Sequence, residues 1–318
     1  MDLEGLCFFY IRHDLISPPL SDDKRRTTKN RGGLMKNQFI LIGILSSLFL
    51  FSCSTYQPYG EPTALALYDV QDGDLISQNQ EVSEADLILH QELWDVAMLA
   101  IPADYQHFIV GFRIESDGPD QILASVEPDG EELLDLSSWT LAVDLMDAVD
   151  RTGALKTEEL TTTLIHEFAH ILSLNSNQII AVNWNEVDFQ EDEEDDRYWT
   201  SEGIAQEDSY LNLFYQRFWT DELLEAVWNI EDAADDEEYT KLWNDLSIAT
   251  YTDFITDYAM TNPEEDFAES FAYYVMNPIP EPTGTLSIEK VLFFDSFPEI
   301  QDIRTELREM LEFNSEES

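Results

Sequence analysis

Two histidines and a glutamate within five residues are the part of this sequence best suited to do chemistry. They form the run His166-Glu167-Phe168-Ala169-His170, an HExxH pattern in a chain with only five histidines. Residues four apart lie on one face of an α-helix, so both imidazoles can bind one metal ion while Glu167 stands beside it. The pattern predicts a Zn²⁺ site with His166 and His170 as ligands and Glu167 as the general base that activates a water.

A catalytic zinc site generally has three protein ligands and leaves one position open, so the two histidines need a partner. Glu202, in Trp199–Ala205, lies in a segment similar to the glutamate-containing helix of gluzincin aminopeptidases. Glu265 is a second candidate, and Glu269 is a third. Capping by Asn262 with Pro263 would also explain an acid at position 265. Capping would not explain Glu269 one turn later on the same face.

The segment Tyr258–Phe271 resembles the second zinc motif of the gluzincin group that includes anthrax lethal factor and zinc metallopeptidase lipoproteins. In that motif a tyrosine precedes a Glu-x-Phe-Ala-Glu helix. The resemblance implies that Glu265 is the third zinc ligand and that Tyr258 donates a hydrogen bond to the developing oxyanion. It also implies that Glu269 is an outer carboxylate that holds a zinc-bound histidine.

These residues together predict a zinc-dependent metallopeptidase that hydrolyses a peptide or protein substrate. Two alternatives stay open. Lipoproteins similar to this chain are associated with substrate import beside outer-membrane uptake proteins, so a zinc hydrolase with a non-peptide substrate is one. A binding lipoprotein with a closed structural zinc site, completed by Glu202, is the other, although such a site has no need of Glu167.

The N-terminal part of the sequence predicts export. A single basic residue after Met35 is followed by the apolar run Phe39–Phe51, which fits a signal peptide over residues 35–52 and is short for a membrane span. The run ends at Cys53 in a pattern that resembles a bacterial lipobox, with Phe51 bulkier than the usual residue there. A short membrane anchor or a buried helix is the alternative interpretation.

This interpretation divides the chain into four parts. Residues 1–34 are more easily explained as the product of a misplaced start codon than as a domain, and residues 53–63 are a polar tether with two prolines. Residues 64–318 are expected to form the zinc metallopeptidase domain. Lipid on Cys53 would anchor the exported protein to a membrane, and Ser54 favours the outer membrane, by resemblance only.

Composition limits the partners and the ligands. The formal net charge of −50 disfavours nucleic acid and anionic lipid as partners. The chain has two cysteines, Cys7 in the excluded segment and Cys53 at the lipid, so a metal site must use histidine and carboxylate. The acidic runs Glu191–Asp196 and Glu231–Glu238 lack the glycine and the alternating spacing of a calcium loop, so we expect solvated loops there.

The hydrophobic pattern predicts an α+β, zincin-like fold, with a small mixed sheet packed on the HExxH helix and a mainly helical C-terminal half. Trp139–Val143 is the expected edge strand that would pair with extended substrate. The expected helix that carries the HExxH motif covers residues 158–173, with Thr157 as its cap. The other expected elements are helices at 83–100, 208–230 and 298–313 and strands at 108–114 and 122–126.

Overall fold

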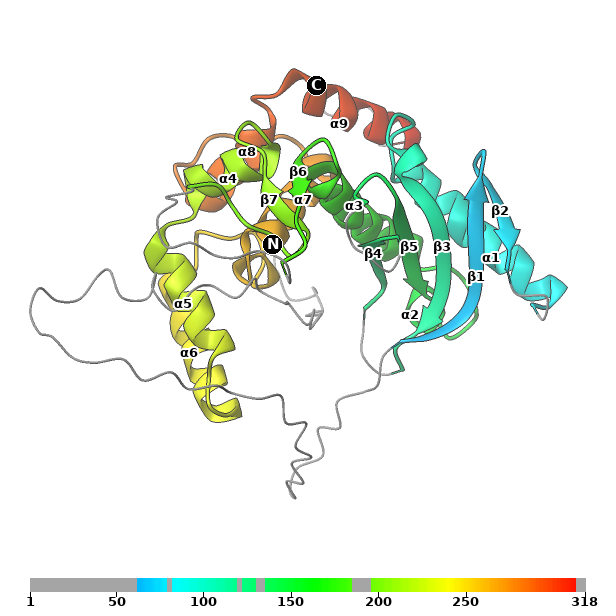
Figure 1. Ribbon diagram of the computed structural model, residues 1–318, viewed down its shortest axis with the longest axis horizontal. Helices are drawn as coiled ribbons and strands as arrows, with labels where there is room; N and C mark the ends of the chain where they lie inside the picture. Colours follow the sequence, from blue (N-terminus) through cyan, green and yellow to red (C-terminus); the bar gives the residue numbers. More distant parts are fainter. Residues whose placement is uncertain (1–61, 79–81, 119–121, 130–134, 185–195, 313–318) are drawn as a thin grey trace, which may run out of the picture.

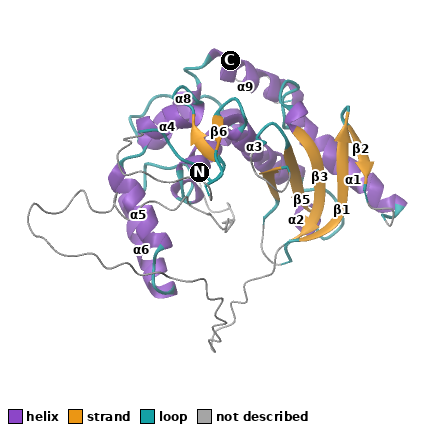
Figure 2. Cartoon of the chain, viewed as in Figure 1, coloured by secondary structure: helices purple, strands orange, loops and turns teal. Residues whose placement is uncertain are grey.

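A computed structural model describes residues 62–78, 82–118, 122–129, 135–184 and 196–312 of the chain (Figure 1). The predicted signal peptide, Cys53 and nearly all of the predicted tether lie outside these residues. In the described part, the larger sheet lies at the right of Figure 2 together with one long helix, and most of the other helices lie at the left around a short pair of strands. Among the described residues, no helix combines the length and the apolar character that crossing a membrane requires.

Seven strands are described. They are β1 (Thr63–Gln71), β2 (Asp74–Ser77), β3 (Ile109–Ser116), β4 (Ala124–Pro128), β5 (Trp139–Asp144), β6 (Ile179–Ala181) and β7 (Gly203–Ala205). The first five form one sheet in the order β2-β1-β3-β5-β4, and β6 pairs with β7 as a separate hairpin. Because β3 and β5 are parallel and the other neighbours are antiparallel, the sheet is mixed, as predicted.

The prediction that Trp139–Val143 is the edge strand is wrong. This segment is β5, which lies between β3 and β4, and β4 is the edge strand on that side of the sheet. Almost every residue of β5 is buried, which is the pattern of a strand covered on both faces. An unbroken apolar run therefore indicated a central strand, and the more polar segment Ala124–Pro128 was the better candidate for the edge. The strands β1, β2, β6 and β7 were not predicted.

The helices divide between the two sides of the molecule. They are α1 (Glu84–Leu99), α2 (Leu145–Ala148), α3 (Thr157–Leu174), α4 (Tyr210–Phe218), α5 (Asp221–Glu231), α6 (Asp236–Ala249), α7 (Pro263–Met276), α8 (Leu286–Phe294) and α9 (Pro298–Met310). Two short 3-10 turns, η2 (Gln106–Phe108) and η3 (Tyr258–Met260), complete the described elements. The expected helices at 83–100, 158–173 and 298–313 are present as α1, α3 and α9.

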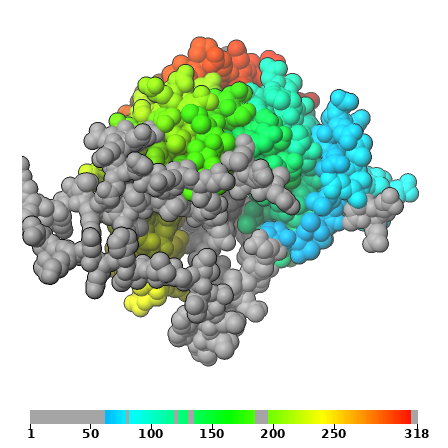
Figure 3. All heavy atoms as spheres, viewed as in Figure 1, coloured from blue at the N-terminus to red at the C-terminus, as the bar shows by residue number. Residues whose placement is uncertain are grey.

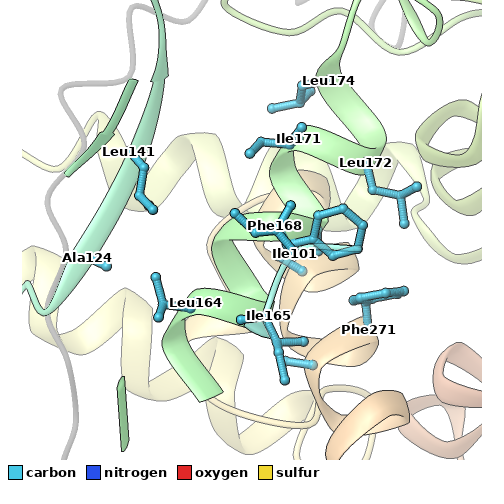
Figure 4. Close-up of a cluster of buried hydrophobic side chains, with 14 of the residues drawn as sticks. Ile101, Ala124, Leu141, Leu164, Ile165, Phe168, Ile171, Leu172, Leu174 and Phe271 are labelled. Atoms are coloured by element: carbon cyan, nitrogen blue, oxygen red, sulfur yellow. The ribbon is translucent and has the colours of Figure 1, made fainter. Parts of the chain in front are cut away.

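Helix α3 carries the HExxH motif and is packed between the sheet and α7. In Figure 4, Leu164 lies on the side of α3 that faces Ala124 and Leu141 of the sheet. On another side Phe168 meets Phe271 of α7 edge to face, with 5.9 Å between the ring centroids. Apolar contacts on two sides hold this helix in place. Thr157 is not its cap: it is the first helical residue, and Lys156 precedes it without a side-chain capping bond.

Helix α7 is the central helix of the C-terminal half. Asn262 caps it, with its side chain accepting a hydrogen bond from the Glu265 amide at 2.8 Å, and Pro263 occupies the first turn. At its other end α9, which runs along the top of the molecule in Figure 3, supplies arginine donors. Arg304 Nε donates to the Tyr274 carbonyl at 2.7 Å, which satisfies one of the last carbonyls of the helix.

Two other expectations need correction. The segment 208–230 is two helices, α4 and α5, because the chain turns at Trp219 and Thr220 caps α5 by accepting from the Leu223 amide. The acidic run Glu231–Glu238 is not a free loop. It ends α5 and begins α6, whose first turn is acidic and is capped by Asp235. Most of the run Glu191–Asp196 lies outside the described residues.

Candidate metal centre

The two histidines of the HExxH motif lie on the face of α3 that is turned toward the start of α7. His166 is buried and His170 is half-buried. Their Nε2 atoms are 3.1 Å apart, and the rings meet edge to face with centroids 4.9 Å apart. The side chains therefore present two imidazole nitrogens at one point, as the four-residue spacing predicted.

Glu265, in the first turn of α7, completes this cluster. Its Oε2 atom lies 3.0 Å from His166 Nε2 and 3.4 Å from His170 Nε2. Tetrahedral zinc with bonds of about 2.0–2.1 Å separates its ligand atoms by about 3.3 Å. The three observed separations are close to that value, and two histidines with a glutamate are a common catalytic zinc ligand set. These residues fit a zinc ion.

The electrostatics of the cluster agree with a ligand set that is held together by opposite charge. Burial by itself would lower the pKa of His166, but hydrogen bonds to Glu265 and Glu269 raise that pKa well above its usual value. Burial would likewise raise the pKa of Glu265, but the neighbouring His170 and His166 hold it well below its ordinary range. Glu265 is therefore an ionised carboxylate at neutral pH, which is the form that binds a cation.

Glu269 lies one turn further along α7 and reaches the other nitrogen of His166. Its Oε1 atom is 2.8 Å from His166 Nδ1. The second carboxylate oxygen, Oε2, accepts a hydrogen bond from Thr256 Oγ1 at 2.8 Å. An acceptor at Nδ1 orients the imidazole and leaves Nε2 to face the cluster.

Tyr258 stands beside the histidines in η3. Its ring centroid is 5.9 Å from that of His166, with the planes inclined by 33°. Burial raises the pKa of the Tyr258 phenol well above its usual value, and the charge of Glu265 raises it further. The phenol therefore keeps its proton and can act as a hydrogen-bond donor in the site.

Glu167 lies between the two histidines in the sequence, and its side chain is buried. Its negative charge affects the pKa values of two other residues of the site, His170 and Tyr258. The pKa of His170 is raised. Burial by itself would lower this pKa, but the charge of Glu265 outweighs the effect of burial, and the charge of Glu167 adds to the rise. Glu167 also contributes, after burial and Glu265, to the raised pKa of Tyr258. The structure thus brings His166, Glu167, His170, Tyr258 and Glu265 into one neighbourhood.

Glu202 is not brought to the two histidines. It precedes β7, and its Oε1 atom accepts a hydrogen bond from Ser201 Oγ at 2.7 Å. Within the described residues, the metal-capable group around the histidines contains Glu265 and not Glu202. Glu202 instead lies near Glu264: burial raises the pKa of Glu264 to about 8, and the charge of Glu202 contributes to that rise.

A fully buried ion pair lies next to the centre and was not predicted. Lys290 Nζ of α8 is 2.7 Å from Asp266 Oδ2, the residue after Glu265. Trp219 Nε1 donates to the same oxygen at 2.9 Å, and Lys290 Nζ lies 3.6 Å from the centroid of the Phe254 ring. The ion pair joins α7 to α8. Through Trp219 and Phe254 it also contacts the segments that precede α5 and follow α6 in the sequence. A lone lysine in an apolar helix carries no signal that identifies its distant partner.

A second acidic group, Asp117, Asp144 and Asp147, also places oxygen atoms near one another. Asp144 has an ordinary structural role there. Its Oδ2 accepts from the Asp117 amide at 2.7 Å, and its Oδ1 caps α2 by accepting from the amides of Met146 and Asp147. We assign no metal to this group.

Comparison with known proteins agrees with the chemistry of the cluster. Residues 138–282 match the model of a family described as "putative zinc-binding metallo-peptidase". The matched segment contains both α3 and α7, and therefore both histidines and Glu265. No curated protein and no solved structure matches the chain.

Proposed function

We propose that the protein is a zinc-dependent metallopeptidase of the gluzincin type, with His166, His170 and Glu265 as the zinc ligands. The observation that carries this proposal is the convergence of three ligand atoms within 3.0–3.4 Å of one another, beside a buried glutamate and a protonated tyrosine. When bound there, zinc supplies Lewis-acid activation of a water and of the substrate carbonyl. The match over residues 138–282 supports the same activity.

The side chains divide the remaining work. Glu167 accepts the proton of the attacking water and returns it to the leaving amine. Tyr258 donates a hydrogen bond to the carbonyl oxygen as negative charge develops on it, and its raised pKa keeps that donor available. Glu269 holds His166 through Nδ1, so that Nε2 stays directed at the ligand cluster.

The edge strand β4 is the proposed support for extended substrate. It packs alongside α3. It pairs with β5 on one side and is the last strand of the sheet, so no other described strand of the sheet pairs with its opposite side. A peptide that added to this edge would gain main-chain hydrogen bonds and would lie beside the helix that carries the histidines. This geometry favours a peptide over a compact non-peptide substrate.

The decisive experiment is replacement of Glu167. The purified protein should bind zinc and cleave members of an unbiased peptide library, and a chelator should abolish cleavage. Glu167→Gln should keep zinc and lose about 10²–10⁴-fold in turnover, because it removes only the proton acceptor. A Glu167→Gln protein with wild-type turnover would contradict the mechanism. Zinc binding without hydrolysis of any peptide would favour one of the two alternatives, a zinc hydrolase with a non-peptide substrate or a binding protein with a structural zinc site.

We also propose that the protein is exported and anchored by lipid on Cys53. The support is the basic start, the apolar run and the cysteine described above, all outside the described residues. The wild-type protein, expressed in a bacterium that processes lipoproteins, should partition into the membrane fraction with a mass increased by the lipid. Cys53→Ala should abolish both. Membrane partition of Cys53→Ala without added mass would instead support an uncleaved anchor.

A further inference from the structure

Thr256 makes two hydrogen bonds that connect separate parts of the centre. Its hydroxyl oxygen accepts from the Ala259 amide at 3.1 Å, which fixes the start of the turn η3 that carries Tyr258. The same hydroxyl donates to Glu269 Oε2 at 2.8 Å. A threonine hydroxyl has a single hydrogen, and because the amide of Ala259 uses an acceptor position, that hydrogen is directed at Glu269.

Glu269 needs such a partner. Its side chain is 22% exposed, whereas those of His166 and Glu265 are each 7% exposed. A glutamate at the border with solvent has several rotamers available, and only those that bring Oε1 to His166 Nδ1 support the histidine. The bond from Thr256 to the second oxygen selects a rotamer in which the first oxygen meets the imidazole at 2.8 Å.

We propose that Thr256 is a positioning residue of the metal centre, acting through Glu269 on His166 while it fixes the turn that carries Tyr258. The proposal rests on the proposed zinc site and goes beyond it. Capping of η3 alone would explain the bond to the Ala259 amide. It would not explain the hydrogen bond to a carboxylate that itself contacts His166.

The same turn offers a matched control. Thr261 Oγ1 donates to the Tyr258 carbonyl at 2.8 Å, so Thr261→Val also removes one hydroxyl hydrogen bond from η3. The bond that is lost there does not involve Glu269. Thr256→Ser keeps both hydrogen bonds of the hydroxyl, whereas Thr256→Val keeps the shape and removes both. Comparing the three variants separates loss of a turn contact from loss of the Glu269 contact.

The measurement is zinc affinity of the metal-free, full-length protein in competition with a coloured chelator. Thr256→Val should bind zinc about tenfold more weakly, the lower end of the range for outer partners of a metal ligand. Thr256→Ser and Thr261→Val should stay within about twofold of wild type on the same principle. The melting temperature of the metal-free protein should fall in both valine variants, and further in Thr256→Val, which loses two hydrogen bonds where Thr261→Val loses one. Equal zinc affinity in Thr256→Val and Thr261→Val would overturn the proposal.

A double-mutant cycle tests whether Thr256 acts through Glu269. In a Glu269→Gln background, Thr256→Val should weaken zinc binding far less than it does in the wild-type background. An equal loss in both backgrounds would overturn the route through Glu269. If Thr256→Val does not fold, Thr256→Ala is used in the same cycle. Wild-type protein that binds no zinc would instead refute the proposed function, because Thr256 would then have no site to support.

Discussion

Glu265 Oε2 lies 3.0 Å from His166 Nε2, although the two residues are far apart in the sequence. His166 belongs to α3 and Glu265 to α7, and α4, α5 and α6 come between these helices along the chain. The contact pairs an ionised carboxylate with an imidazole whose pKa is raised well above its usual value by Glu265 and Glu269, against the effect of burial. Zinc binds the neutral form of an imidazole, and the raised pKa of His166 favours its protonated form. Zinc binding therefore competes with protonation of His166, so zinc affinity, measured by chelator competition at several pH values, should increase with pH.

The first prediction concerns the third ligand. Glu265→Gln should weaken zinc binding by more than the roughly 10–100-fold that loss of an outer partner causes, because it removes a charged ligand atom. Glu202→Gln is the control, since Glu202 lies outside the cluster. Bound zinc is measured by elemental analysis after dialysis. If Glu202→Gln lost zinc and Glu265→Gln retained it, Glu202 and not Glu265 would be the third zinc ligand.

A second prediction concerns Tyr258. Tyr258→Phe should retain zinc and the KM of a cleaved peptide, while kcat falls by about 10²–10³-fold, because the lost hydrogen bond forms only as charge develops on the carbonyl oxygen. Steady-state kinetics with one peptide from the library measures this. A rise in KM with unchanged kcat would show that the phenol binds the ground state instead.

A third prediction concerns the buried ion pair behind the centre. Lys290→Met should lower the free energy of unfolding by roughly 3–5 kcal/mol, because Asp266 would remain as a buried carboxylate without its cation. The double variant Asp266→Asn/Lys290→Met should recover part of that loss, since no charge is then left buried. Urea denaturation of four proteins, the wild type, Lys290→Met, Asp266→Asn and the double variant, measures the difference. Additive losses in the double variant would show that the two charges are not coupled.

The fourth prediction is a pH dependence of stability that Glu264 causes. Burial raises the pKa of Glu264 from 4.5 to about 8, although Tyr198 Oη donates to its Oε2 at 2.6 Å. Between these two values the folded state holds a proton that the unfolded chain has lost, so stability declines as pH rises through this window. Glu264→Gln stays neutral, so it should be increasingly more stable than wild type from pH 5 to pH 9.

Urea denaturation at several pH values gives this comparison as a difference between variant and wild type. Glu281→Gln, at an exposed position, is the control for loss of one carboxylate from a very acidic protein. Its stability relative to wild type should change little with pH over the same window. An equal pH trend in the two variants would mean that general charge repulsion, and not burial of Glu264, causes the effect.

Local patterns in the sequence were sufficient for the parts of the centre that lie on one element. The spacing of His166 and His170 places both imidazoles on one face of any helix, because four residues make about one turn. Asn262 and Pro263 likewise predict where α7 begins, since capping depends only on neighbouring residues. The resemblance of Tyr258–Phe271 to a known motif directed attention to Glu265, and the structure brings Glu265 to the histidines.

Only the tertiary structure decided how these elements meet. The order of the strands places β4 and not β5 at the edge, because pairing partners depend on the whole sheet and not on one segment. Which of Glu265 and Glu202 lies beside the two histidines depended on how α7 packs against α3. The contacts of Thr256 with Glu269 and of Lys290 with Asp266 join residues whose own sequence neighbourhoods do not specify a partner. Residue types and local spacing determined the chemistry available, and long-range packing determined which groups share a site.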